Sequence, residues 1–173
     1  MHPSRLPIEE LEKECRWSFS RASGPGGQHR NKVETAAMVV HLPSGISGAA
    51  TEKRSQAENR AVAMHRLRCA LAVEWRDLSA PKALENAMPS EVWMAYARGG
   101  RLKIAPTNPL YPSVLAEAME RLVAMDWNLG SVAEAMRISA TQLIQLLGDY
   151  PAALQALNAQ LVAQGRSPRT VKR

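Results

Sequence analysis

The residues best suited to do chemistry stand in the stretch SGPGGQHRNK, from Ser23 to Lys32, whose composition fits neither a helix nor a strand. The paired glycines Gly26 and Gly27 permit positive φ and let the backbone approach a bulky partner without a Cβ in the way. Gln28 follows them directly. Two interpretations stay open: an ordinary glycine-rich turn, or a loop that presents its backbone to a ligand. A phosphate-binding P-loop does not fit, because the G-x-x-x-x-G-K-[ST] pattern and a directly following helix are both missing.

Positive charge concentrates around this stretch. The chain has a formal net charge of +6 and a sequence pI near 9.7, which favours a polyanionic partner. The segment from Arg16 to Arg68 holds nine basic and three acidic residues, so it carries the whole net charge. The basic residues are Arg16, Arg21, Arg30, Lys32, Lys53, Arg54, Arg60, Arg66 and Arg68.

Composition limits the remaining possibilities. Hydrophobic residues make up 46% of the chain and aromatic residues 5%, which predicts an aliphatic, alanine-rich core. No apolar run approaches the roughly 20 residues that a membrane-spanning helix needs, and the acidic N-terminus is untypical of a targeting peptide. Cys15 and Cys69 lack metal-ligand spacing and indicate two reduced structural thiols. We therefore expect a cytoplasmic monomer with no metal, no cofactor and no membrane contact.

Short strands are expected to hold the loop. Residues 15–20 (CRWSFS) alternate apolar and polar side chains, as in a half-buried strand. Residues 34–42 form a second strand candidate, and Pro43 and Gly45 favour a tight turn into a third strand over 46–51. The pattern predicts a small antiparallel or mixed sheet with the loop between its first two strands.

A helix should follow the sheet and pack on it. Ser55 and Glu58 fit the S-x-x-E capping box, which marks a helix start. Apolar residues recur every three or four positions after it and predict one core-facing stripe: Ala57, Ala61, Met64, Leu67, Leu71 and Trp75. Together these elements predict an α+β fold over residues 1–80.

The rest of the chain is predicted to be helical. Residues 81–112 are rich in turns and are expected to be a connector with one short helix at 91–97. A helical module should occupy 113–165, followed by a short basic tail at 166–173. Its helices are expected to span 113–126, to start with a Ser131–Glu134 capping box, to run from Ser139 to a stop at Gly148, and to run from Pro151 to Gly165.

The first 71 residues hold more than a glycine pair. Four pieces occur in the order and spacing of a known protein family: RASGPGGQH (21–29), Asn31, HLPSGI (41–46) and RSQAENRAVA (54–63). In this respect the chain resembles the catalytic domain of class I peptide-chain release factors. It is most similar to their codon-independent relatives, the ribosome-rescue peptidyl-tRNA hydrolases.

The resemblance implies hydrolysis of the ester that joins a nascent peptide to P-site tRNA, with Gly26, Gly27 and Gln28 as the catalytic residues. Negative charge develops on oxygen when water attacks an ester, and prepositioned donors stabilise it. The resemblance assigns this role to the backbone N–H of Gln28. It also implies that a methyltransferase can N-methylate Gln28.

The resemblance further implies contacts with large-subunit rRNA and P-site tRNA. Cations that touch the phosphate backbone position a protein without reading sequence. The residues expected to do so are Arg16, Arg21, His29, Arg30, Lys32, Arg54 and Arg60. Arg98 and Arg101 lie beyond the resemblance and are expected RNA contacts for another reason, because RGGR combines positive charge with a flexible backbone. A general-base role for His29 is not favoured, because related proteins accept side chains there that cannot act as bases. For each of these residues a solvated surface charge, or for Arg98 and Arg101 a polar turn, is the alternative interpretation.

The chain departs from the pattern in several places. Arg30 stands where an apolar residue is usual. Only fourteen residues precede Cys15, so we expect no stop-codon-reading domain and hence codon-independent action. The tail at 166–173 is short, whereas the rescue relatives carry a long basic one.

A second class of function stays open. Residues 131–147 are typical of a helix-turn-helix, which would suit a non-enzymatic regulator that binds nucleic acid. Side chains expected to be exposed on its second helix are Ala140, Thr141, Gln142 and Gln145, and none is basic. Weak phosphate attraction therefore favours a packing or docking role over DNA reading.

Overall fold

The computed structural model describes residues 2–20, 35–75, 84 and 87–171. The chain divides into two compact units, Pro3–Trp75 and Arg76–Arg173, and each is described by itself. The predicted boundaries at residues 80, 112 and 165 stay predictions. The elements of the first unit are the 3-10 helix η1 (Pro3–Arg5), α1 (Ile8–Lys13), β1 (Cys15–Ser20), β2 (Ala36–His41), β3 (Ser47–Ala50) and α2 (Gln56–Glu74).

The first unit confirms the predicted α+β fold. Its three strands form one antiparallel sheet in the order β1-β2-β3. The β2–β3 turn closes through a 2.8 Å hydrogen bond from the Gly45 N–H to the His41 carbonyl, with Gly45 at φ +72°. Positive φ costs a glycine little, which explains why the predicted turn forms here.

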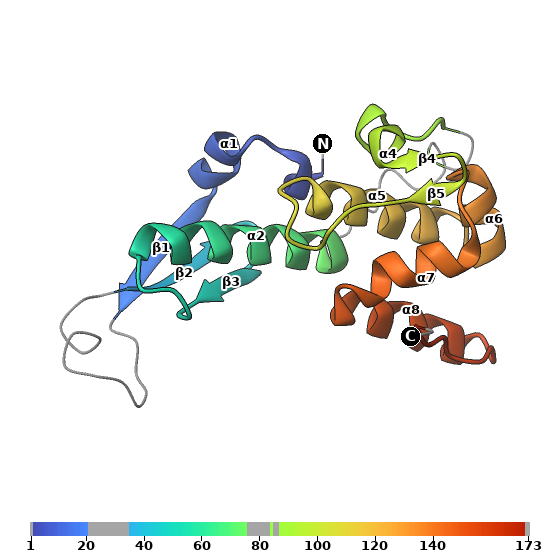
Figure 1. The fold of residues 1–173 in the computed structure, drawn as a ribbon. Coiled ribbons are helices and arrows are strands. Elements are labelled where there is room, and N and C mark those ends of the chain that lie inside the picture. Colours follow the sequence, from blue (N-terminus) through green and yellow to red (C-terminus); the bar gives the residue numbers. More distant parts are fainter. Residues whose placement is uncertain (1, 21–34, 76–83, 85–86, 172–173) are drawn as a thin grey trace. The chain divides into compact units, whose positions relative to one another are not determined.

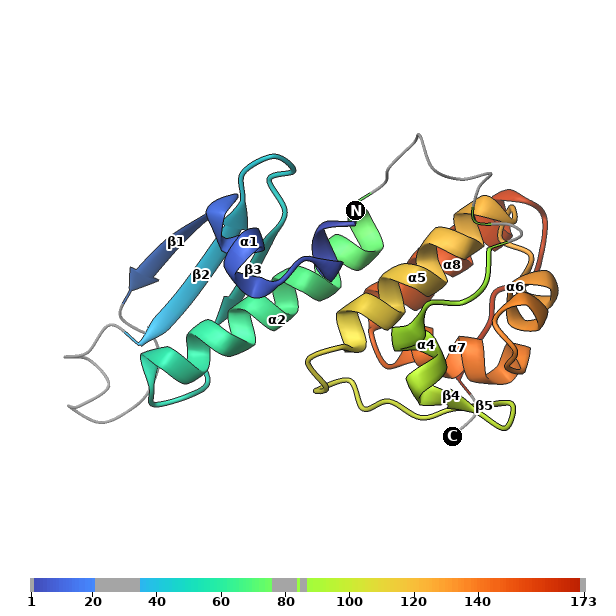
Figure 2. The ribbon, with the colours of Figure 1, turned by 90° about the horizontal axis from the view of Figure 1, so that it is seen from above.

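Helix α2 runs along one face of the sheet (Figures 1 and 2). The two pack very closely at Gly48 of β3, where a Cβ would lie 2.2 Å from the Ala63 carbonyl oxygen and 2.5 Å from the Leu67 nitrogen. Only glycine permits this approach. The core between helix and sheet contains Leu11, Ala37, Val39, Ala50, Ala63, Met64, Leu67 and Leu71.

The predicted apolar stripe of α2 is wrong over its first two turns. Met64, Leu67 and Leu71 are buried, but Ala57 and Ala61 are exposed. Asn59 and Ala63 occupy the inward face instead. The helix begins at the end of the sheet where β2 starts. Asn59, in the inward position there, hydrogen-bonds the backbone of Thr35 and Lys53, which alanine cannot do.

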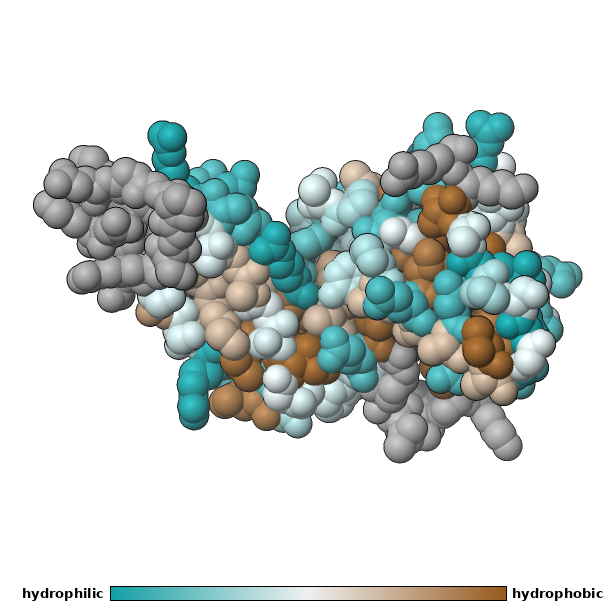
Figure 3. Space-filling view, turned by 90° about the horizontal axis from the view of Figure 1, so that it is seen from below, coloured by the Kyte–Doolittle hydropathy of each residue, from teal (hydrophilic) through white to brown (hydrophobic). Residues whose placement is uncertain are grey.

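The far face of the sheet is exposed. Direct cross-strand partners share a face and alternate residues point oppositely, so Arg16, Ser18 and Met38 point away from α2. Met38 is 42% exposed. Figure 3 shows brown and tan hydrophobic residues reaching the surface of this unit between teal ones.

The second unit is mainly helical. Its described elements are α4 (Glu91–Tyr96), β4 (Ala97–Arg98), β5 (Arg101–Leu102), α5 (Tyr111–Ala124), α6 (Leu129–Ala135), α7 (Ala140–Gly148) and α8 (Pro151–Ala163). The short helix at α4 is confirmed. The antiparallel β4–β5 hairpin is not predicted by the sequence pattern, because two-residue strands are too short to show alternation.

Helix ends in this unit follow from local chemistry. Ser139 caps α7 by accepting the Gln142 N–H at 3.2 Å, and Gly165 (φ +71°) follows α8, both as predicted. The predicted Ser131–Glu134 box is wrong, because Asn128 accepts the N–H groups of residues 130 and 131 and starts α6 earlier.

Gly148 does not stop α7 as predicted. It is the last helical residue, and a Cβ on it would lie 2.1 Å from the Val171 side chain. Packing against the C-terminal segment therefore explains this glycine better than a helix stop does.

Three buried polar side chains of the second unit donate to backbone carbonyls. The Trp93 indole N–H donates to the Met136 carbonyl at 3.0 Å, and the Tyr111 hydroxyl donates to the Leu146 carbonyl at 2.8 Å. Arg121, which is 1% exposed, donates to the Leu84 carbonyl at 3.0 Å. These bonds join α4, α5, α6 and α7 around one core.

Over the described residues, every helix is too short or too polar to span a bilayer.

Candidate active site

The strands on either side of the glycine-rich segment, β1 and β2, meet at one end of the sheet. Ser20, the last residue of β1, is paired directly with Ala36, the first residue of β2. The described residues that flank segment 21–34 therefore lie next to each other. Seven predicted site residues lie outside the described residues: Arg21, Gly26, Gly27, Gln28, His29, Arg30 and Lys32.

The start of α2 lies at the same end of the sheet. Ser55 caps the helix by accepting the Glu58 N–H at 3.5 Å. Asn59, which is fully buried, donates its amide N–H groups to the carbonyls of Thr35 (2.6 Å) and Lys53 (3.0 Å). Its amide oxygen accepts the Lys53 N–H at 2.9 Å. Asn59 thus joins the re-entry point of the loop to the helix start.

An aromatic stack lies beside this end. The rings of Trp17 and Phe19 are parallel within 2°, with centroids 5.9 Å apart, and the Arg60 guanidinium carbon lies 4.7 Å from the Trp17 ring centroid. Phe19 is 36% exposed. The alternation in residues 15–20 places both rings on the helix-facing side, but it does not reveal that the second ring reaches solvent.

Not all the basic residues of the first unit are free to bind a partner. Arg60 pairs with Glu12 at 2.9 Å, and Arg66 pairs with Glu52 at 2.6 Å. The guanidinium of Arg68 is buried and donates twice to the Ser4 carbonyl, at 3.0 and 2.8 Å. Buried Arg68 therefore serves the fold, whereas Arg60 and Arg66 are half-exposed and each already faces a carboxylate.

Arg16 and Arg54 differ from them. Both side chains are exposed, and neither forms an ion pair within the part of the chain that the structure describes. Arg16 lies on the far face of the sheet, whereas Arg54 directly precedes the α2 cap. Lys53, next to Arg54, is exposed as well. These cations are available to an external anion.

The remaining two predicted RNA contacts lie in the second unit. Arg98 and Arg101 form a directly opposed pair in the β4–β5 hairpin. Lys103 and Tyr96 stand beside them and line the same hollow. Sequence reasoning missed these two, although Lys103 follows Arg101 at the spacing of two that places strand residues on one face.

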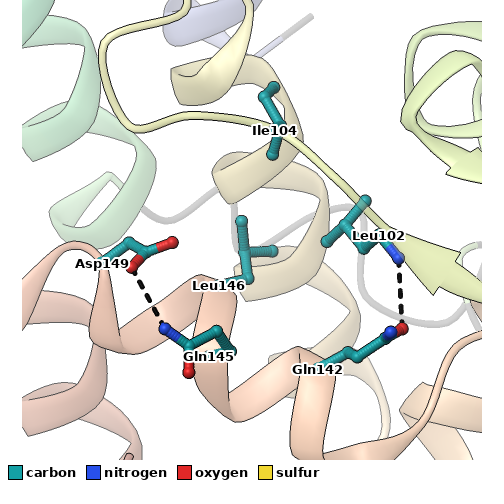
Figure 4. Close-up of a pocket in the computed structure, with 6 residues that line it drawn as sticks. All are labelled: Leu102, Ile104, Gln142, Gln145, Leu146 and Asp149. Carbon is teal, nitrogen blue, oxygen red and sulfur yellow. Dashed lines mark hydrogen bonds between the residues drawn. The ribbon is translucent and has the colours of Figure 1, made fainter. Parts of the chain in front are cut away.

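One contact within the second unit weighs against the helix-turn-helix alternative. Gln142 of α7 is half-buried, and its Oε1 accepts the Leu102 N–H of β5 at 3.1 Å (Figure 4). Gln145 donates to Asp149 at 3.4 Å in the same view. Ala140 and Gln142 are thus less exposed than expected, while Thr141 and Gln145 are exposed. Part of the predicted reading face of α7 serves to hold the hairpin.

Metal ligation finds no support among the described side chains. No cluster of three His, Cys, Asp or Glu residues stands close enough there to hold an ion. His41 uses both ring nitrogens internally, Nδ1 with Ser44 Oγ at 2.7 Å and Nε2 with Glu14 Oε2 at 3.0 Å. It braces the β2–β3 turn against the residue before β1.

The fold and site define a small α+β domain that holds a glycine-rich loop beside free cations. The profile of the RF-1 domain matches residues 4–98, more than half of the chain, and reaches into the second unit. The chain belongs to the RF-1 domain family.

The matches to curated relatives cover part of this chain and a smaller part of each relative. The chain is 48% identical over 75 residues to peptide chain release factor 1 of Acidiphilium cryptum (43% of this chain, 21% of the relative). It is 41% identical over 90 residues to peptide chain release factor 2 of Paramagnetospirillum magneticum (51% and 24%). It is 47% identical over 66 residues to the chloroplastic release factor PrfB1 of Arabidopsis thaliana (38% and 14%). The match spans less than a quarter of each relative's length.

Proposed function

We propose that this protein is a codon-independent peptidyl-tRNA hydrolase that acts on the ribosome and releases the nascent peptide from stalled complexes. The observation that carries the proposal is the Gly-Gly-Gln sequence at 26–28, set between the paired ends of β1 and β2 in a chain of the RF-1 domain family. Release factors are among the relatives of this domain.

The chemistry requires a positioned dipole more than a reactive side chain. Water attacks the ester carbonyl, the acyl–oxygen bond breaks, and the ribose oxygen leaves with a proton. The backbone N–H of Gln28 stabilises the charge on oxygen, and donors that are already in place do this at the least cost in reorganisation. Gly26 and Gly27 let the backbone bend inside an RNA cavity.

The described residues on either side of the loop support this proposal. The Ser20–Ala36 pair closes its base, and Asn59 holds Thr35 against α2. Arg16 and Arg54 supply exposed charge for rRNA or tRNA phosphates. The partners we propose are large-subunit rRNA, P-site peptidyl-tRNA and a methyltransferase for Gln28. The protein acts as a cytoplasmic monomer, with residues 1–80 as the catalytic domain and the helical module at 113–165 as its ribosome-docking part.

Peptide release from purified ribosomes tests the proposal. Complexes that hold a labelled peptidyl-tRNA in the P site are prepared with truncated mRNA, with a sense codon or a stop codon in the A site, and as separated large subunits. We expect release without a stop codon. We further expect release to be lost in Gln28→Ala and Gly27→Ala while ribosome binding, measured by co-sedimentation, persists.

Each arm has an outcome that contradicts part of the proposal. Release that occurs only with a stop codon overturns codon independence. Equal release by the wild type and by Gln28→Ala removes the loop from catalysis. The substitution Ala61→Gln, on an exposed turn of α2, serves as the matched control and should leave release unchanged.

A further inference from the structure

The β4–β5 hairpin gathers positive charge on one face. Its register pairs Arg98 with Arg101, and the Lys103 N–H donates to the Tyr96 carbonyl at 3.1 Å, which extends the ladder by one pair. Opposed residues share a face, and so do residues two apart in a strand. Tyr96, Arg98, Arg101 and Lys103 therefore form one face, named here the cationic hairpin face.

The turn brings the two arginines as close as a hairpin allows. Gly99 and Gly100 have φ values of +56° and +73°, as a two-residue turn of the I′ type requires. Nothing lies within 4 Å of a Cβ built on either glycine. The two glycines are therefore needed for their backbone conformation and not for space, and the turn is open to a partner.

Among the described residues, none forms an ion pair with the cationic hairpin face. Arg98, Arg101 and Lys103 are exposed. Like charges directly opposite each other in an antiparallel pair are destabilising. The arrangement thus costs stability in the free protein and is suited to an anion that lies across both guanidinium groups.

The opposite side of the hairpin is firmly supported. Ala97 is buried, and the Leu102 N–H donates to Gln142 Oε1 at 3.1 Å. Figure 4 shows Leu102 and Ile104 facing α7 near Leu146. The side of the hairpin opposite the charged face is therefore packed and hydrogen-bonded to α7.

The same face borders a hollow large enough for phosphate groups. An open hollow of about 370 Å³ is lined by Ala95, Tyr96, Arg98, Arg101 and Lys103. The Asn108 side-chain amide donates to the Tyr96 hydroxyl at 3.2 Å, which fixes that wall. A planar guanidinium can donate two parallel hydrogen bonds to a phosphate, so two opposed arginines suit neighbouring phosphates of one strand.

We propose that the cationic hairpin face binds the phosphodiester backbone of RNA, in addition to any contacts that the first unit makes. RNA as the anion rests on the proposed function, because a partner of a ribosome-acting domain is rich in closely spaced phosphates. Contacts of this kind add affinity without sequence preference and make it salt-dependent.

The test uses the full-length protein and a fluorescein-labelled single-stranded oligoribonucleotide of mixed sequence, followed by fluorescence anisotropy at several salt concentrations. The variant Arg98→Gln/Arg101→Gln is compared with Arg137→Gln/Arg169→Gln, which removes two exposed charges elsewhere in the same unit. We expect the hairpin variant to bind about tenfold more weakly and its salt slope to fall by about 1.4, the value for two lost contacts to a single strand. The control variant should bind like the wild type.

Three further arms separate the alternatives. The melting temperature of the hairpin variant should not fall, because the arginines stabilise no part of the fold; a lower value would indicate a structural role and overturn the proposal. Equal RNA binding by the two double variants would also overturn it. So would tighter binding of oligoglutamate than of RNA, which would indicate an acidic protein partner. Gln28→Ala should bind the oligonucleotide normally, so failure of peptide release and failure of this proposal are distinguishable.

Discussion

Asn59 of α2 donates its side-chain amide to the carbonyl oxygen of Thr35 at 2.6 Å, across 24 positions of sequence. Thr35 is the first described residue after the glycine-rich loop, and Asn59 lies one turn into the helix. The same amide bonds both backbone groups of Lys53. One buried side chain thus couples the helix start, the segment before it and the end of the loop.

Replacing Asn59 by alanine should therefore affect both stability and release. The change leaves two carbonyls and one N–H without their partner, and we expect the free energy of unfolding to fall by about 1–3 kcal/mol. Urea unfolding measures this, with Ala61→Gln as an exposed control on the same helix. If the bond positions the loop, peptide release should fall more than the folded fraction does. An unfolding midpoint equal to that of the control would contradict the assignment.

Gly48 offers a test of the sheet–helix contact. A methyl group there would meet backbone atoms of Ala63 and Leu67, which cannot rotate away. Gly48→Ala should therefore cost about 1–3 kcal/mol or more, the usual cost of overpacking. Ala49→Ser, on the exposed neighbouring position, should change the midpoint little. Thermal unfolding of both variants decides the point, and a stable Gly48→Ala would mean that α2 can move away freely.

The sequence predicted the sheet well because its signals are local. Period-two alternation located β1, and the Pro43–Gly45 turn located the β2–β3 connection. The stripe of α2 failed at Ala57 and Ala61 because alanine suits an exposed helix face as well as a buried one. Counting back four residues at a time from Leu67 gives Ala63 and Asn59, so the periodicity contained the correct face.

The candidate site was predicted only in part. Charge density pointed to the segment around the loop, but it could not separate exposed Arg16 and Arg54 from buried Arg68. That difference depends on a carbonyl 64 positions away, at Ser4. Pairing of Arg98 with Arg101 likewise depends on the strand register set by the glycine turn.

Exposed and paired arginines should behave differently when neutralised. Arg16→Gln/Arg54→Gln should weaken ribosome binding and lower its salt slope without changing the melting temperature, because these side chains have no ion-pair partner among the described residues. Arg68→Gln should instead destabilise the fold by about 1.5–3 kcal/mol, the range for hydrogen bonds to a charged group. Co-sedimentation with ribosomes and thermal unfolding separate the two effects. The reverse pattern would show that the burial of these side chains is misassigned.

The two cysteines should be unreactive in the native protein. Burial, aided by the charges of Glu12 and Glu14, raises the pKa of the Cys15 thiol to about 11. Burial raises the pKa of the Cys69 thiol to about 12, against the opposing effect of Arg68. Each unit by which the pKa rises lowers the thiolate fraction tenfold at neutral pH. The thiolate is the reactive form of cysteine. Relative to an ordinary thiol of pKa 9.0, alkylation should be about a hundredfold slower at Cys15 and slower still at Cys69.

The same shifts set the sign of the pH dependence. A thiol whose pKa is raised on folding keeps its proton in the native state while the unfolded chain loses it, so stability is full below the unfolded pKa and declines as pH rises toward 11 and 12. Iodoacetamide labelling at about pH 8, with and without concentrated urea, should be slow in the folded protein and fast in the unfolded one. Cys15→Ser and Cys69→Ser assign the signal to each site. Equal rates in the two conditions would mean that neither thiol is shielded in the folded protein.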